Sequence, residues 1–317
     1  MWAYIFRRLI YNIPVYLGIL LLLMAALRVH DPVYSYLGKV ATQQEYDQLA
    51  ARMGLDQPFI VQYGRFLGEV VTLDFSTHSW ARPGVTVGSM LADAVVPSLM
   101  LTVPALVLTF LISVCIGLIS AYFRGRPIDR ILVIGAVIGM SISFLVYIVL
   151  GQYFGAYKLN EALGVQLFAI EGYEPGLGNW VHYCMLPVLI SVIVALGYDT
   201  RYYRAVIVEE SSADYITTAR AKGAAEGKIL FVHMLKNAMI SIVTRVMITL
   251  PFLITGSILL EYYFNIPGMG RTLLSAITVK DFPVIQAFTG IFGAFFIASN
   301  ILTDVVYALV DPRVRLS

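Results

Sequence analysis

Six long apolar stretches separated by polar segments dominate the hydrophobic pattern of this chain. They cover residues 10–27, 97–122, 131–152, 183–200, 237–260 and 284–309. At about 1.5 Å of rise per residue, each is long enough for a helix that crosses about 30 Å of hydrocarbon. The first stretch is too long for the apolar part of a signal peptide, and no small-residue cleavage site follows it. The pattern therefore predicts six transmembrane helices, the first of them a retained anchor.

The distribution of lysine and arginine predicts on which side of the membrane each segment lies. With the N-terminus inside, the inside segments hold Arg7, Arg8, Arg124, Arg126, Arg130, Arg201, Arg204, Arg220, Lys222, Lys228, Lys236, Arg313 and Arg315. The short outside loops hold only Lys158, Arg271 and Lys280. The long segment 28–96 does not weigh against this orientation, because loops above about 60 residues translocate largely regardless of charge. Both termini are therefore expected in the cytoplasm.

Three ionisable side chains fall within the apolar stretches. Arg245 lies in the fifth stretch, where a central position costs about 2.5–3.5 kcal/mol on insertion scales. We therefore expect it near the cytoplasmic end of the helix or facing a polar interior. Asp199 and Asp304 are expected near the cytoplasmic ends of their spans, where carboxylates are solvated or paired. Neither aspartate has the features of a proton relay.

The composition supports a membrane protein and excludes several other classes. Hydrophobic residues make up 59% and charged residues 13% of the chain, against about 45–50% and about 25% in soluble domains. A cytosolic enzyme, a disordered protein and a secreted disulfide scaffold are therefore excluded. A net charge of +2 and the lack of a basic run argue against a nucleic-acid partner. Cys115 and Cys184 lie in apolar stretches and are expected to be buried, and the four histidines share no metal-ligand spacing.

The polar segment 201–236 contains the signals of a short helix. Ser212 is expected as the N-cap, with Asp214 in the first turn, Lys222 in the last turn and Gly223 at the position after the C-cap. These signals predict a helix of about eleven residues on the cytoplasmic side.

A second short helix is expected over residues 224–236, so that the two helices project together from the membrane. Tyr215, Ile216 and Ala219 share one side of the first helix at helical spacing. An alternative interpretation is a pair of helices that lies flat on the lipid headgroups.

Motifs along nearly the whole chain resemble those of the permeases of binding-protein-dependent ABC importers, and specifically of the peptide type. The cytoplasmic EAA loop of that family is matched by Asp214-Tyr215-Ile216 and by Ala219-Arg220-Ala221-Lys222-Gly223. Further matches occur in the family order at Arg7-Arg8-Leu9, Gly54-Leu55-Asp56-Gln57-Pro58, Arg124-Gly125-Arg126, Leu186-Pro187, Pro267-Gly268-Met269-Gly270-Arg271 and Asp311-Pro312-Arg313. Their order and spacing together are specific for this family.

The resemblance implies an all-α polytopic membrane protein of six transmembrane helices, with the type I ABC importer permease (MetI-like) fold and both termini cytoplasmic. Residues 1–96 would form an N-terminal anchor helix and a long periplasmic loop. Residues 97–317 would form a five-helix permease core that includes the cytoplasmic coupling loop 201–236. The expected location is the bacterial inner membrane.

The resemblance also implies partners. A permease of this kind pairs with a homologous permease subunit, and the pair binds two ABC ATPase subunits and a periplasmic or lipid-anchored solute-binding protein, within membrane lipid. The chain has no P-loop of its own, because Gly227-Lys228 is followed by Ile229 and the first glycine position is Lys222. We therefore expect a non-catalytic subunit without a cofactor, with ATP–Mg bound by the ATPase subunits.

The resemblance assigns coupling to the ATPase subunits to residues 209–237. The expected contact residues are Glu209, Asp214, Tyr215, Ile216, Ala219, Arg220, Ala221, Lys222 and Gly223. A rigid, capped helix can pass ATPase closure to the fourth and fifth spans as rigid-body motion. Gly223→Asp or a bulky residue at Ala219 is expected to abolish transport and leave the protein inserted.

The turn formed by Pro267, Gly268, Met269 and Gly270 is a candidate periplasmic gate or docking site.

Departures from the family pattern leave the solute open. Thr217 and Thr218 stand where the EAA pattern has Glu and Ala, and Ser141-Ile142-Ser143-Phe144 stands where many relatives carry a proline. Candidate solutes are di- or oligopeptides, a nickel complex, glutathione and antimicrobial peptides. A stand-alone secondary transporter is the alternative, although neither an internal repeat nor paired mid-membrane ionisable groups are apparent. The residues that line the pathway cannot be assigned, since all-apolar spans give no helix phase.

Overall fold

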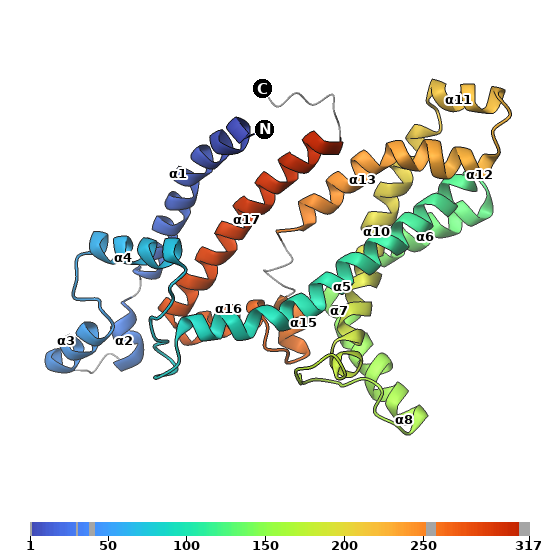
Figure 1. Cartoon of the computed structure of the whole chain (residues 1–317). Coiled ribbons are helices and arrows are strands. Elements are labelled where there is room, and N and C mark those ends of the chain that lie inside the picture. Colours follow the sequence, from blue (N-terminus) through green and yellow to red (C-terminus); the bar gives the residue numbers. More distant parts are fainter. Residues whose placement is uncertain (1, 30, 38–41, 252–257, 311–317) are drawn as a thin grey trace.

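The computed structural model describes residues 2–29, 31–37, 42–251 and 258–310, and these residues form helices without a β-sheet (Figure 1). The predicted match at Asp311-Pro312-Arg313 lies outside the described residues. The helices are α1 (Trp2–Leu27), α2 (Pro32–Leu37), α3 (Gln43–Arg52), α4 (Phe59–Thr72), α5 (Val87–Tyr122), α6 (Pro127–Ser141), α7 (Phe144–Leu150), the π-helix η1 (Gly151–Lys158), α8 (Leu159–Leu163), α9 (Trp180–Tyr183), α10 (Met185–Glu210), α11 (Asp214–Ala221), α12 (Glu226–Lys228), the π-helix η2 (Ile229–Met234), α13 (Leu235–Thr249), α15 (Ile258–Tyr263), α16 (Met269–Val279) and α17 (Phe282–Val310).

Five helices in the described part of the chain are long and apolar enough to cross a membrane. They are Phe6–Leu27, Val87–Tyr122, Met185–Glu210, Glu226–Thr249 and Phe282–Val306. A sixth span exists if α6 and the helices from α7 to α8 are taken together. Large apolar side chains on these helices stay exposed, for example Ile131 at 67% and Ile134 at 57%. Exposed apolar surface of this extent requires a hydrocarbon environment, which confirms an all-α membrane protein.

The third predicted stretch is broken rather than straight. α6 and α7 meet at an angle of 93°, because Ile142 and Ser143 adopt extended backbone conformations with ψ of 134° and 140°. The Tyr147 hydroxyl then donates to the Gly139 carbonyl at 2.9 Å and satisfies one of the carbonyls freed at the end of α6. The prediction of one continuous helix over residues 131–152 is therefore wrong.

The fifth span begins earlier than the apolar pattern indicated. One helix runs from Glu226 through η2 to Thr249, so residues 224–236 do not form a separate helix. That expectation is wrong because the polar side chains of this segment lie on the exposed side of a helix whose Ile229, Leu230 and Met234 are buried. The predicted end at residue 260 falls after residues 252–257, which lie outside the described part of the chain.

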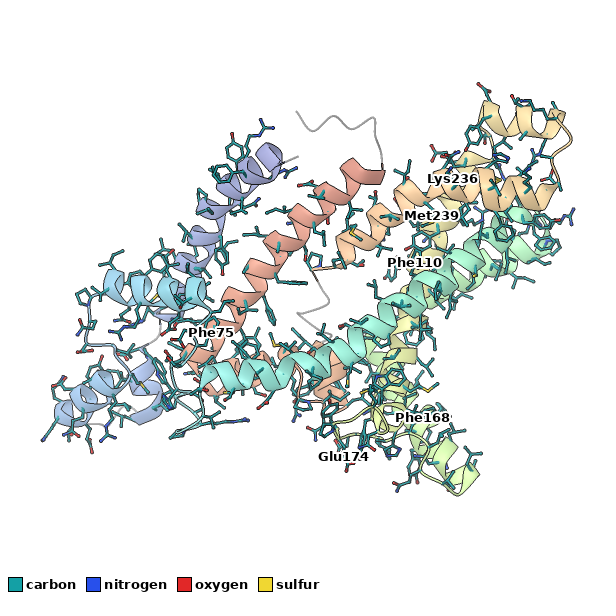
Figure 2. All side chains as sticks on the ribbon, viewed as in Figure 1. Phe75, Phe110, Phe168, Glu174, Lys236 and Met239 are labelled. Atoms are coloured by element: carbon teal, nitrogen blue, oxygen red, sulfur yellow. The ribbon has the colours of Figure 1, made fainter. Side chains whose placement is uncertain are left out.

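Three buried apolar clusters follow one another along α5, which is about 54 Å long at the usual helical rise. Leu91 joins the first cluster, with residues of α1, α4, α16 and α17. Leu101 joins the second, with residues of α7, η1, α10 and α15. Leu118 joins the third, with residues of α10, α11, η2 and α13. Phe110 of α5 and Met239 of α13, both labelled in Figure 2, are partly buried and pack against the third cluster.

Two glycines allow α10 to approach its neighbours closely. A Cβ atom on Gly197 would lie 2.9 Å from the Ala136 carbonyl oxygen of α6. A Cβ atom on Gly117 of α5 would lie 3.3 Å from the Arg204 backbone nitrogen of α10. Small residues at such contacts are typical of helix packing in membranes. α10 is therefore held tightly between α5 and α6.

The buried cysteine predicted in the fourth stretch is confirmed, whereas the other is not. Cys184 is 1% exposed, but Cys115 of α5 is exposed. Cys115 lines a cavity between α5 and the start of the fifth span, together with Leu118 and Leu230.

The start of α1 and the end of α17 lie at the same end of the molecule as α11, and α8 lies toward the opposite end (Figure 1). The predicted topology places both termini and the loop between the fourth and fifth spans on the cytoplasmic side of the membrane, and this orientation stays a prediction.

Candidate functional site

α11 is a separate helix of eight residues between the spans α10 and α13. The expected Ser212 cap is wrong: Ser212 lies in the turn that ends α10, where its N–H donates to the Glu209 carbonyl at 3.1 Å. Ala213 is the N-cap, without a side-chain hydrogen bond, so the helix is shorter than predicted. Gly223 follows the C-cap with φ of +78°, a left-handed conformation that favours glycine. The predicted glycine stop is confirmed.

Ile216 fixes α11 to the membrane-spanning helices. Its side chain is fully buried and packs in the third cluster with Ile207 of α10 and Ile229 of η2. Ala219, one turn further on, is partly buried against the same cluster. A movement of α11 must therefore be accompanied by a movement of the ends of α10 and α13, because the packed apolar contacts connect them.

The nine predicted coupling residues divide into two groups. Ile216 is buried and Ala219 is partly buried, so both hold α11 in place. The other seven are exposed: Glu209, Asp214, Tyr215, Arg220, Ala221, Lys222 and Gly223. The structure therefore separates residues that anchor the helix from residues that are free to contact another subunit.

Polar contacts define the exposed side of α11. The Tyr215 hydroxyl donates to the Glu210 carboxylate, and partial burial, with this neighbouring carboxylate, raises the pKa of Tyr215. Arg220 pairs with Glu226 at 3.1 Å. Both partners of that pair are largely exposed, so it contributes little to stability.

A cavity of ≈ 470 Å³ lies between α11 and the loop that joins α5 to α6. Its lining includes Arg124, Arg126 and Arg220 and a single carboxylate, Glu226. Three guanidinium groups against one carboxylate make this cavity basic.

A buried ion pair holds the neighbouring ends of α5, α6 and α10 together, and the sequence did not reveal it. Arg204 of α10 donates to the two oxygens of Asp129 at 2.6 and 2.8 Å. Asp129 lies in the first turn of α6 and also accepts from Ser120 of α5 and, at 2.9 Å, from the Gly125 backbone N–H. The side chain of Asp129 is only 5% exposed. Bidentate pairs of this kind fix geometry strongly.

The predicted turn at Pro267, Gly268, Met269 and Gly270 lies at the start of α16, and Met269 and Gly270 are its first helical residues. Pro267 lines a cavity beside α16. Met269 is fully buried. A Cβ atom on Gly268 would overlap the Glu261 carboxyl group, which explains why a glycine stands there.

Glu261 is the buried acid at the centre of this turn, and it was not among the predicted site residues. The Ser98 hydroxyl of α5 donates to its carboxylate at 2.6 Å, and the Arg271 backbone N–H donates at 2.9 Å. Ser98 in turn accepts from the Met269 N–H at 2.7 Å. The first N–H groups of a helix have no intrahelical partner, so Ser98 and Glu261 together cap α16.

The three ionisable residues predicted within the spans, Asp199, Arg245 and Asp304, all form ion pairs in the structure. Arg245 of α13 donates from Nε to Asp199 of α10 at 3.2 Å. Arg8 of α1 pairs with Asp304 of α17 at 3.2 Å. Asp199 lies in the middle of α10, because this helix continues to Glu210 and not only to residue 200 as predicted.

Comparison with known proteins shows the family. Residues 113–316 match the family described as "binding-protein-dependent transport system inner membrane component". A putative peptide permease of Brucella suis biovar 1 is 34% identical over the full length of both chains. A glutathione transport system permease of Salmonella paratyphi A is 34% identical over 99% of each chain. A probable peptide ABC transporter permease of Sinorhizobium fredii is 31% identical over 99% of this chain and 100% of its own. The chain therefore belongs to this family and is a multi-pass inner-membrane permease subunit of an ABC importer, without a catalytic role of its own.

Proposed function

We propose that this chain is the permease of an importer for di- or oligopeptides and forms the translocation pathway with a homologous permease. Two ABC ATPase subunits bind ATP–Mg in the cytoplasm, and a solute-binding protein delivers the peptide from outside. The names of similar permeases, two for peptides and one for glutathione, support this solute class. Glutathione, itself a tripeptide, is the second candidate.

The observation that carries the coupling part of this proposal is the construction of α11. Its inner side is fixed by Ile216 to the ends of two spans, and its outer side exposes charged and aromatic side chains. An element that receives force from an ATPase subunit needs both features. We propose that Asp214, Tyr215, Arg220 and Lys222 contact the ATPase subunits.

Reversing or removing the exposed groups of α11 tests this contact. In Tyr215→Ala/Lys222→Glu we expect solute uptake by the reconstituted importer to fall at least tenfold, while the melting temperature of the permease changes little. These two positions give a cleaner test than Gly223→Asp or a bulky residue at Ala219. Gly223 has a positive φ and Ala219 packs in the third cluster, so those variants also disturb α11 itself.

The matched control is Arg130→Glu, a charge reversal at an exposed residue of α6 outside α11. It should leave uptake within twofold of the unmodified importer. Unchanged uptake in the double variant would remove α11 from the coupling mechanism.

The solute class is tested on the cognate solute-binding protein. Its melting temperature is measured with a dipeptide, a tripeptide, glutathione and a nickel complex in turn. Stabilisation by the peptides, growing with ligand concentration, is expected. Stabilisation by the nickel complex alone would show that the solute class is wrong.

A further inference from the structure

The ion pair between Arg245 and Asp199 lies near the middle of the membrane-spanning helix α10. At 1.5 Å per residue, Asp199 is about 21 Å from the start of α10 and about 16 Å from its end. Ionisable side chains at this depth face a bundle interior or a water-filled space, and not lipid.

The pair is nevertheless open on one side within this chain. The side chain of Arg245 is 36% exposed and that of Asp199 is 15% exposed. The neighbouring Tyr202 is 37% exposed, and its ring centroid lies 5.7 Å from the Arg245 guanidinium carbon. Since lipid is excluded as a neighbour, this side of α10 and α13 must meet either another polar surface or the aqueous pathway.

Arg245 keeps hydrogen-bonding capacity that the pair does not use. Only its Nε donates to Asp199, and among the described residues its two terminal nitrogens donate to no other group. A guanidinium has five N–H donors in a planar fork that matches a carboxylate. The side of the Arg245 guanidinium that carries the two terminal nitrogens therefore suits a carboxylate that arrives from outside the chain.

We propose that Arg245, held in place by Asp199, lines the translocation pathway and binds the C-terminal carboxylate of the peptide in transit. This inference rests on the proposed peptide import. Asp199 keeps Arg245 partly neutralised, so the carboxylate is held weakly enough to leave again, as passage through a pathway requires. Tyr202 presents its ring beside the Arg245 guanidinium group.

The test compares two probes in the complete importer, reconstituted with its binding protein: trialanine, and trialanine amide, which lacks the carboxylate. The measured quantity is the ratio of their uptake rates. Because the same binding protein serves every variant, its own preference cancels between variants. In Arg245→Leu/Asp199→Leu, which leaves no unpaired charge, we expect this ratio to fall about tenfold. ATP hydrolysis stimulated by the loaded binding protein should stay within twofold of normal.

The exchanged pair Arg245→Asp/Asp199→Arg shows whether Arg245 contacts the solute or whether the ion pair only holds α10 and α13 together. It preserves an ion pair between α10 and α13 and moves the guanidinium to the other helix. We expect a changed uptake ratio here too, whereas a normal ratio in the exchanged pair would show that the pair only holds the helices together. The control Arg8→Leu/Asp304→Leu removes a second interhelical pair and should leave the ratio unchanged.

Failure of the proposed function gives a different result. If the unmodified importer hydrolyses ATP in response to its binding protein but moves neither probe, peptide import and the role of Arg245 in it both fail. If it moves both probes and the double leucine variant keeps the normal ratio, only the role of Arg245 fails.

Discussion

Replacing Glu261 by alanine is expected to destabilise the permease by about 3–6 kcal/mol and to abolish transport. The substitution leaves the Ser98 hydroxyl of α5 and the Arg271 N–H of α16 without their acceptor. A hydrogen bond to a charged group contributes about 1.5–3 kcal/mol, and Glu261 makes two of them while fully buried. The measurement is the melting temperature in detergent, together with uptake in proteoliposomes.

The conservative variant Glu261→Gln serves as the control. Its amide oxygen can accept one of the two hydrogen bonds, so we expect it to lose less than half of the stability that the alanine variant loses. Equal melting temperatures for Glu261→Ala and the unmodified protein would contradict the role assigned to this side chain at the turn.

Replacing Asp129 by alanine is the second change for which we expect a large effect, about 3 kcal/mol of destabilisation. Removing one partner of a buried ion pair leaves an uncompensated charge, and such changes cost about 3–5 kcal/mol. The lower end of this range of destabilisation applies because the Arg204 side chain is 26% exposed and keeps part of its hydration. Ser120 also loses its acceptor. Chemical or thermal unfolding of the purified protein measures this effect.

The pair of Lys158 and Glu161 provides a matched control. Its atoms lie 2.6 Å apart, but both side chains are about half exposed. Glu161→Ala should therefore change stability far less than Asp129→Ala does. An equal effect of the two alanine substitutions would mean that the burial of Asp129 does not matter.

Much of the architecture could be predicted from the sequence because membrane spans depend on local properties. Apolar stretches of sufficient length identify a helix without knowledge of its neighbours. The glycine stop at Gly223 was likewise predicted from one residue type. The break at Ile142 was not, because an isoleucine is compatible with a continuous apolar helix and only the backbone conformation shows the 93° bend.

The polar centres could not be predicted because they join residues that are distant in the sequence. Ser98 and Glu261 are 163 residues apart, and Arg204 and Asp129 are 75 apart. Arg245 and Asp199 were recognised individually as unusual, but their pairing depends on how α13 packs against α10. The same packing determines that Ile216 anchors α11 and does not contact another subunit, a distinction that the family motif does not make.

Cross-linking from α11 tests the central claim most directly, namely that this helix connects the permease to its ATPase subunits. In a background with Cys115→Ser and Cys184→Ala, Lys222→Cys and Asp214→Cys are each combined with a short thiol-reactive cross-linker in the assembled importer. The account predicts that both positions cross-link to an ATPase subunit, whereas Lys158→Cys, near α8 toward the opposite end of the molecule, does not. The account is contradicted if the ATPase subunits co-purify with the permease but neither α11 position cross-links to them.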